Sequence, residues 1–203
     1  MRTSISATKR AIEVIRDNGG SIRTQKAIAS GIYPRTLANL VEEGKMEKLS
    51  RGLYRIAKQH TSADQDLLTV ATLVPSGVIC LISALAFHKM TTQIPREVNI
   101  ALPRSARTPR VDYPPVSIHR FSSKALTKGI EKHIIDGTTI NIYNVEKTLA
   151  DCFKFRNRIG MDVVLEALKL YKSRKKFNIN SVIHFARICR VEKQITPYLE
   201  SIA

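Results

Sequence analysis

The chain has 203 residues, and its 33 Lys and Arg residues against 17 Asp and Glu residues give a formal net charge of +16. A surplus of this size attracts phosphate and releases counterions on binding, so it favours a nucleic-acid partner; an acidic protein partner is the alternative. A hydrophobic content of 43% is ordinary for a globular protein, and the length allows one sizeable core or a small domain followed by a larger one.

Neither secretion nor membrane insertion is expected. The N-terminus lacks the continuous apolar stretch of a signal peptide, and the longest apolar run, around Val78 to Leu85, is far shorter than a bilayer span. Cys80, Cys152 and Cys189 are odd in number, widely spaced and without metal-ligand spacing. We therefore expect a protein of the reducing cytoplasm with no disulfide framework, no metal and no cofactor.

The first expected element is an amphipathic helix. Ala11, Ile12, Val14 and Ile15 would form its apolar face, and Asn18-Gly19-Gly20 would stop it.

Residues 21–30 and 34–43 are expected to form a helix-turn-helix. Ala27 is small enough to let two helices approach closely, and Gly31 can adopt the positive φ of the sharp turn between them. The motif's apolar positions are filled by Ile32, Leu37 and Leu40.

The second of these helices is expected to be followed by a wing. Pro34 suits its first turn, and Gly44 ends it as a C-cap glycine. Lys45 to Ser50 and Leu53 to Ile56 then flank Arg51-Gly52, a two-residue hairpin turn with a basic tip. Helix, turn, helix and basic wing in this order predict a winged helix-turn-helix.

The predicted recognition helix turns Leu37, Leu40 and Val41 toward the core, so its opposite side is free for bases. Arg can pair with guanine and Asn with adenine, and Thr can contact a thymine methyl or a phosphate; the same residues are also ordinary on an exposed helix. The candidate base contacts are Tyr33, Arg35, Thr36 and Asn39. The candidate phosphate and wing contacts are Arg23, Thr24, Gln25, Lys26, Lys48 and Arg51.

A polar stretch from Lys58 to Asp64 separates this domain, residues 1–57, from a second domain over residues 62–203. The second domain is expected to begin with a helix at 64–73, capped by Thr61 or Ser62, and a buried helix in the apolar run at 78–90. Strands are expected at 98–102, 116–121, 133–135 and 139–143, the last two joined by a turn at Asp136-Gly137, and helices at 145–155, 161–171, 181–189 and 195–202. The predicted fold class is α+β, with a small, mostly antiparallel sheet and a helical end.

Two basic clusters in this second part are exposed-loop candidates. Either could extend a DNA footprint, hold an acidic partner or simply be solvated. They are Arg104, Arg107 and Arg110 after the 98–102 strand, and Lys172, Arg174, Lys175 and Lys176 after a helix.

The sequence contains no recognisable active site. The five histidines lack ligand spacing, and His88 is expected to be a packed or capping residue. Cys152 lies in an apolar helical run, which favours a core role over a nucleophile. Asp151 and Glu146 are expected as polar helix residues with Lys147 as a neighbouring counter-charge. The scattered carboxylates argue against a metal-dependent nuclease, and we do not expect an enzyme.

The chain as a whole resembles the AbiEi family of antitoxins from abortive-infection toxin–antitoxin systems. The resemblance is carried by SRGLYRI at the end of the winged helix, PSGVICLISALAFHKMTTQIP, VNIALPR and NIYNVEKTLADCFKFRNRIGMDVVLEALKLY, which span most of residues 20–171. It implies a two-domain protein that represses its own operon by binding inverted repeats in double-stranded DNA. It also implies an antitoxin-like C-terminal domain that counteracts a nucleotidyltransferase toxin without a stable complex, and it carries over no catalytic residue.

The alternative function is a protein-interaction module whose winged helix docks on an acidic protein. Specific affinity for the upstream DNA would favour the regulator, whereas salt-resistant capture of an acidic partner without DNA affinity would favour the module.

Overall fold

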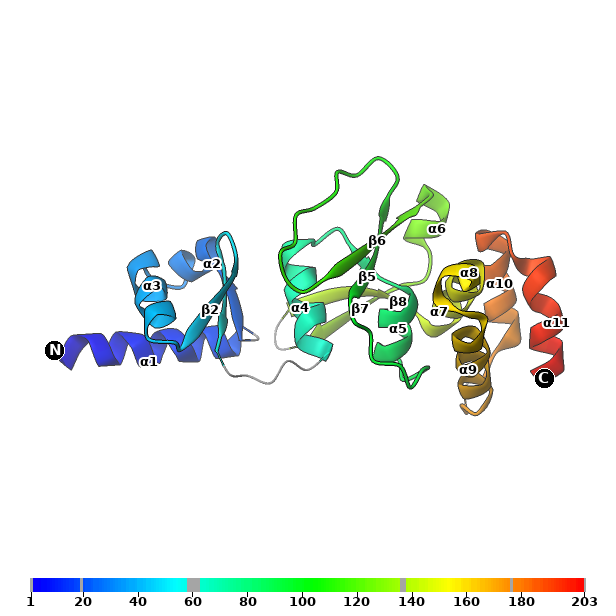
Figure 1. The fold of residues 1–203 in the computed structure, drawn as a ribbon, viewed down its shortest axis with the longest axis horizontal. Helices are drawn as coiled ribbons and strands as arrows, with labels where there is room; N and C mark the ends of the chain where they lie inside the picture. Colours follow the sequence, from blue (N-terminus) through cyan, green and yellow to red (C-terminus); the bar gives the residue numbers. More distant parts are fainter. Residues whose placement is uncertain (1, 19, 58–62, 136–137, 176, 203) are drawn as a thin grey trace.

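The structure is a computed structural model that describes residues 2–18, 20–57, 63–135, 138–175 and 177–202. It is an α+β protein, as the sequence predicts, and it contains a three-stranded and a five-stranded sheet. Figure 1 shows an elongated molecule with the smaller sheet and its helices at one end and a helical layer at the other. The predicted domain boundary falls largely on residues 58–62, which lie outside the described residues.

The N-terminal part packs three helices against the three-stranded sheet. Its core gathers apolar residues from α1 and α3 and from the sheet; Ile15, Leu37 and Leu40 are all 0% exposed. The sheet has the antiparallel order β1-β3-β2. In chain order the elements are α1 (Arg2–Asp17), β1 (Ser21–Arg23), α2 (Thr24–Ala29), α3 (Pro34–Glu42), β2 (Met46–Ser50) and β3 (Leu53–Ile56).

The helix predicted from residue 21 is wrong at its start, because Ser21–Arg23 forms the edge strand β1. Ser21 pairs with Arg55 and Arg23 with Leu53 on the wing strand β3. Three residues are too few for a period to show in sequence, and the pairing partner lies some thirty residues away. The wing hairpin itself is confirmed, with Gly52 at φ +77 in its turn.

The second sheet has the order β6-β5-β4-β8-β7 and is mixed rather than mostly antiparallel. β4 pairs antiparallel with β5 and parallel with β8, β5 and β6 are parallel, and β7 and β8 are antiparallel. Its elements and the helices between them are α4 (Ala63–Leu73), β4 (Val78–Ile79), α5 (Leu81–Phe87), β5 (Val98–Pro103), β6 (Val116–Phe121), α6 (Ser123–Thr127), β7 (Ile130–Ile135) and β8 (Thr138–Tyr143).

The central strand β4 explains the error. The apolar run at 78–90, predicted as one helix, begins as this two-residue strand and becomes α5 only at Leu81. A fully apolar run does not distinguish a buried strand from a buried helix, and β4 is buried between β5 and β8. Its parallel pairing with β8 and the parallel pairing of β5 with β6 together make the sheet mixed.

The helical end agrees closely with the sequence prediction. Its helices are α7 (Val145–Lys154), α8 (Arg156–Ile159), α9 (Met161–Lys172), α10 (Ile179–Cys189) and α11 (Glu192–Ile202). Cys152 is a buried core residue as predicted. His88 is the C-cap of α5, and its Nε2–H donates to the Tyr143 carbonyl at 2.7 Å. The predicted turn at Asp136-Gly137 and the capping residues Thr61 and Ser62 lie outside the described residues.

A buried ion pair lies where the helical end meets the large sheet. Lys147 and Asp151, one turn apart on α7, are 0% and 1% exposed, and the Lys147 Nζ donates to Asp151 Oδ2. The ammonium lies 4.2 Å from the centre of the Tyr143 ring and 4.9 Å from that of Phe121. Cys189 donates from its Sγ to the other carboxylate oxygen of Asp151 at 3.0 Å. The counter-charge predicted from sequence is therefore a core contact that joins α7, α10, β6 and β8.

His119 on β6 gives the fold a predicted acid sensitivity. It is buried, its Nε2–H donates to Asn99 Oδ1 at 2.8 Å, and its Nδ1 has no partner among the described residues. Burial, helped by Arg158, lowers the pKa of His119 to about 4. In the unfolded chain the imidazole binds a proton near pH 6.5, whereas in the folded chain it stays neutral to lower pH. The contribution of neutral His119 to the free energy of unfolding should therefore be lost as pH falls from about 6.5 to about 4.

The measurement is urea unfolding of the protein and of His119→Gln across this pH range. The stability advantage of the unsubstituted protein over the variant should shrink toward low pH. A difference that stays constant from pH 7 to pH 4 would contradict the assignment.

Candidate nucleic-acid interface

The corner between α2 and α3 is built as the sequence predicts. Ala27 is 0% exposed, and Gly31 has φ +78. The Ile32 N–H donates to the Ala27 carbonyl at 2.8 Å, which closes the turn. An added Cβ at Gly31 would meet no atom within 4 Å, so the turn needs glycine for its backbone angle and not for space.

The α3 helix has one buried and one exposed side. Leu37 and Leu40 are fully buried, whereas Arg35 and Asn39 are exposed and Thr36 is half-buried. Tyr33 is the N-cap residue and is 73% exposed. Arg35 in the first turn and Asn39 one turn later are thus accessible on α3, whereas Tyr33 and Thr36 line a pocket with residues of α1.

The wing is attached to the start of α2. The Thr24 N–H donates to the Gly52 carbonyl at 2.8 Å, and its hydroxyl donates to the same oxygen at 3.3 Å. Both donors of Thr24 are therefore engaged, which weakens its predicted phosphate role. Arg51 and Lys48 on the hairpin are exposed, as are Gln25 and Lys26 on α2.

Arg23 has a different environment from the one predicted. Its Nη2 donates to the carbonyls of Thr72 at 2.8 Å and Leu73 at 3.1 Å, at the C-terminal end of α4. A cation at this end of a helix interacts favourably with the helix dipole. Arg23 therefore links the small sheet to α4, and any phosphate would have to compete with that contact.

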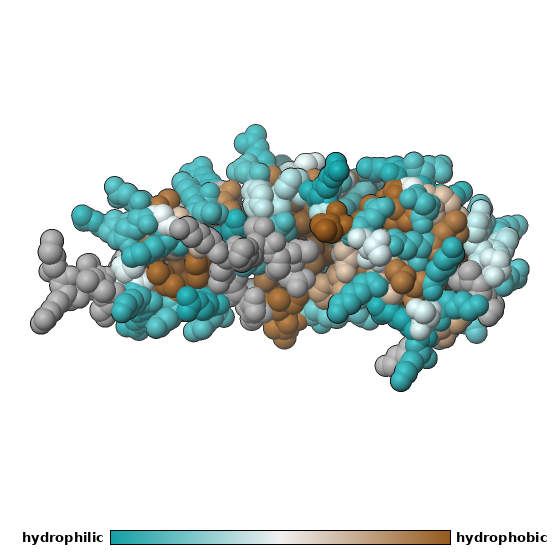
Figure 2. Space-filling model, turned by 60° about the horizontal axis from the view of Figure 1, so that its bottom comes forward, coloured by the Kyte–Doolittle hydropathy of each residue, from teal (hydrophilic) through white to brown (hydrophobic). Residues whose placement is uncertain are grey.

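The two predicted basic clusters lie at separate places. Arg104, Arg107 and Arg110 are exposed on the loop between β5 and β6. Tyr113, later in the same loop, places its ring 5.4 Å from the Arg55 guanidinium of β3, so this loop approaches the winged helix. The face of the molecule in Figure 2 is largely hydrophilic, with hydrophobic residues in separate patches.

The second cluster lies at the end of α9. Lys172 and Lys175 are exposed, and Arg174 donates to the His88 carbonyl, which ties it to the C-cap of α5. Lys176 lies outside the described residues. The fold does not join this cluster to α3, which Figure 1 shows at the opposite end of the molecule.

Sequence reasoning missed Arg55, which is 7% exposed on β3 and donates to Glu47 Oε2 at 2.9 Å. Nothing in LYRI distinguishes this arginine from an exposed wing residue, since its burial depends on the loop that brings Tyr113.

Among the described residues, no group of three or more His, Cys, Asp or Glu side chains could hold a metal ion. The helices of the described segments also include none that is long and apolar enough to cross a bilayer.

Comparison with known proteins agrees with this geometry. A crystal structure of the RV2827C protein from Mycobacterium tuberculosis is similar in fold, with a TM-score of 0.56 and 12% identity, covering 96% of this chain and 81% of that one. A search of curated proteins gives no match. Residues 9–57 match the family described as "Transcriptional regulator, AbiEi antitoxin". The matched segment coincides with the winged helix. The resemblance predicted from sequence is thus confirmed over this segment, where the matching family model is that of the AbiEi antitoxin transcriptional regulators.

Proposed function

We propose that the protein binds inverted repeats in its own promoter through α3 and represses transcription of its operon. The observation that carries the proposal is the exposed polar side of α3, opposite Leu37 and Leu40 in the core. Arg35 and Asn39 on that side have the side-chain chemistry that reads guanine and adenine in the major groove. Arg51 on the wing supplies a backbone contact next to the groove.

The wider surface supports the same partner. The net charge of +16 provides a sequence-independent attraction to DNA. The exposed arginines Arg104, Arg107 and Arg110 lie on the loop that approaches the winged helix through Tyr113. An inverted repeat needs two winged helices, supplied by a dimer or by two monomers that bind cooperatively.

We further propose that residues 62–203 form the antitoxin part, which counteracts a nucleotidyltransferase toxin without a stable complex. Support comes from the family match of the winged helix and from the resemblance of the later segments to AbiEi antitoxins. Co-expression with the neighbouring toxin gene tests this part: growth should be rescued by the full chain, and failure to rescue would contradict it.

The test of DNA binding is a titration of the region upstream of the gene against shuffled DNA of equal length. The upstream DNA should bind more tightly, and the logarithm of affinity should fall with that of salt by about 0.9 per phosphate contacted. Arg51→Ala should weaken binding to both DNAs and reduce this slope by about one. Equal binding to both DNAs, or salt-resistant capture of an acidic protein alone, would overturn the proposal.

A further inference from the structure

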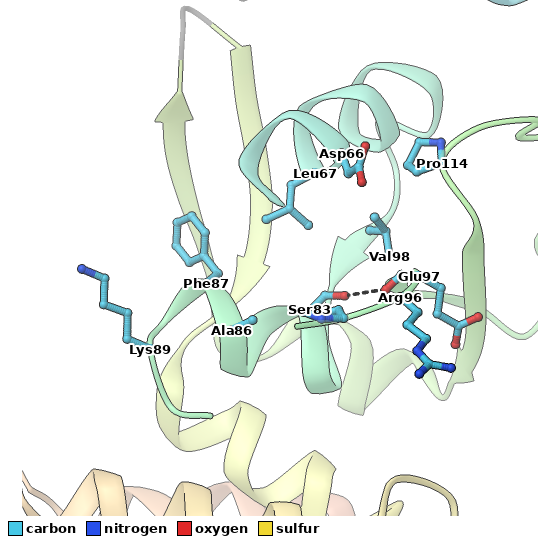
Figure 3. Close-up of a pocket in the computed structure, with 11 residues that line it drawn as sticks. Asp66, Leu67, Ser83, Ala86, Phe87, Lys89, Arg96, Glu97, Val98 and Pro114 are labelled. Atoms are coloured by element: carbon cyan, nitrogen blue, oxygen red, sulfur yellow. Dashed lines mark hydrogen bonds between the residues drawn. The ribbon is translucent and has the colours of Figure 1, made fainter. Parts of the chain in front are cut away.

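A cavity of about 350 Å³ lies beside α4, away from the predicted DNA-binding side chains. Its walls are largely apolar, with Leu67 from α4, Phe87 from α5, Val98 from β5 and Pro114 from the loop before β6. Figure 3 shows Leu67 and Asp66 on α4 facing the space between Phe87 and Pro114. A volume of this size falls in the range of small-molecule sites.

One polar atom in this cavity lacks a partner. Asp66 Oδ1 is buried and accepts no hydrogen bond from the described residues. Burial raises the pKa of this carboxyl, against the opposing effects of Arg55 and of a hydrogen bond with Tyr113. A buried carboxylate oxygen without a donor is costly, so a ligand that donates there would stabilise the site.

The other polar groups of the cavity do not need a ligand. The Ser83 hydroxyl donates to the Glu97 carbonyl at 3.2 Å and accepts from the Asn99 N–H at 2.9 Å. Lys89, Arg96 and the Glu97 carboxylate are exposed at the rim. A ligand that fits this cavity therefore carries a hydrogen-bond donor next to Asp66 and an apolar part that fills the remaining space.

The same carboxylate lies next to the winged helix. The Arg55 guanidinium acts electrostatically on Asp66 and lies 5.4 Å from the Tyr113 ring, and its Nη1 has no partner among the described residues. At the other end of α4, Arg23 holds the carbonyls of Thr72 and Leu73. Arg23 of the small sheet thus contacts α4, which forms one wall of the cavity, and Arg55 of the same sheet acts on Asp66 of α4 through its charge.

We propose that this cavity is an effector site for a small apolar or aromatic amine, whose ammonium group pairs with Asp66 and thereby alters the charge interaction between Asp66 on α4 and Arg55 on the winged helix. A ligand shifts a conformational equilibrium only by its differential affinity for the two states, and the Asp66 carboxylate is the group on which the charges of both the amine and Arg55 act. The proposal does not depend on DNA binding, because it concerns the free protein.

The experiment uses 2-phenylethylamine as the probe and phenylacetate, which carries an anion on a similar ring, as its counterpart. NMR titration of the full chain should give a Kd of about 1 mM for the amine, a reasonable value for so small a ligand, and no saturable binding of phenylacetate. Asp66→Asn should lower the affinity for the amine by tenfold or more, because a charged hydrogen bond is lost. Ala86→Leu, which narrows the cavity and keeps Asp66, should also weaken it.

The matched control is Glu131→Gln, which removes the same charge from the exposed edge strand β7 and should leave the affinity unchanged. Hydrogen exchange of the amides of β3 and α4 should change on addition of the amine, without DNA present. No saturable binding of the amine, equal binding of phenylacetate, or equal affinity in Asp66→Asn would overturn the site. Binding without any change in exchange on β3 would overturn its link to the winged helix.

Discussion

Replacing Lys147 by Met is expected to lower the free energy of unfolding by about 3–5 kcal/mol. The substitution keeps the length of the side chain but leaves Asp151 buried, and among the described residues only the Cys189 thiol then remains as a donor to it. Burial already raises the pKa of Asp151, and Lys147 opposes that rise, so the carboxyl should bind a proton in the variant. The substitution also removes the contacts of the ammonium with the Tyr143 and Phe121 rings.

Thermal and urea unfolding measure this effect. For a chain of this length the midpoint should fall by roughly 6–20 °C. Lys154→Met, an exposed lysine of the same helix, is the matched control and should cost little. The double variant Lys147→Met with Asp151→Leu should recover much of the loss, because a well-packed apolar pair replaces a buried ion pair at little cost. A double variant as unstable as the single one would show that packing, and not the unpaired carboxylate, sets the cost.

Replacing Arg35 and Asn39 together by Ala is expected to abolish most of the preference for the upstream DNA. Each bidentate contact to a base discriminates by about 1–3 kcal/mol, so the pair should account for a loss of roughly 30-fold to 10⁴-fold in specific affinity. Affinity for shuffled DNA should change much less, since phosphate contacts elsewhere remain. Fluorescence anisotropy with both DNAs at fixed salt measures the two affinities.

The control for this experiment is Lys193→Ala on α11, an exposed cation at the far end of the molecule in Figure 1. It should leave the ratio of the two affinities unchanged. If the double variant lost affinity for both DNAs in equal proportion, α3 would be a phosphate-binding helix and not the element that reads sequence.

The agreement between sequence and structure is best where a signal is local. Gly31 at the corner, Pro34 in the first turn of α3 and Gly52 in the wing turn each act within a few residues, through a positive φ or a fixed one. At the C-terminal end, α7, α9, α10 and α11 were predictable to within a few residues because their apolar residues recur over about three turns, whereas the four-residue α8 was not predicted.

The errors arise where pairing over long distances decides. β1 becomes a strand because β3 lies beside it, and β4 is extended because it lies between β5 and β8. A strand of two or three residues is too short for its hydrophobic pattern to show that it pairs with a distant strand. The mixed sheet order follows from the same long-range pairings.

The sequence by itself determined the winged helix and the exposed side of α3, because these rest on turn chemistry and on helical period. The family whose model matches residues 9–57 was indicated by the resemblance of sequence segments. Only the tertiary structure decided that Arg23 and Arg55 of the small sheet contact α4 and its surroundings, that Asp66 faces an apolar cavity, and that Lys147 is buried. Each of these depends on which distant elements exclude water from a charged group, and burial of that kind is a property of the assembled fold.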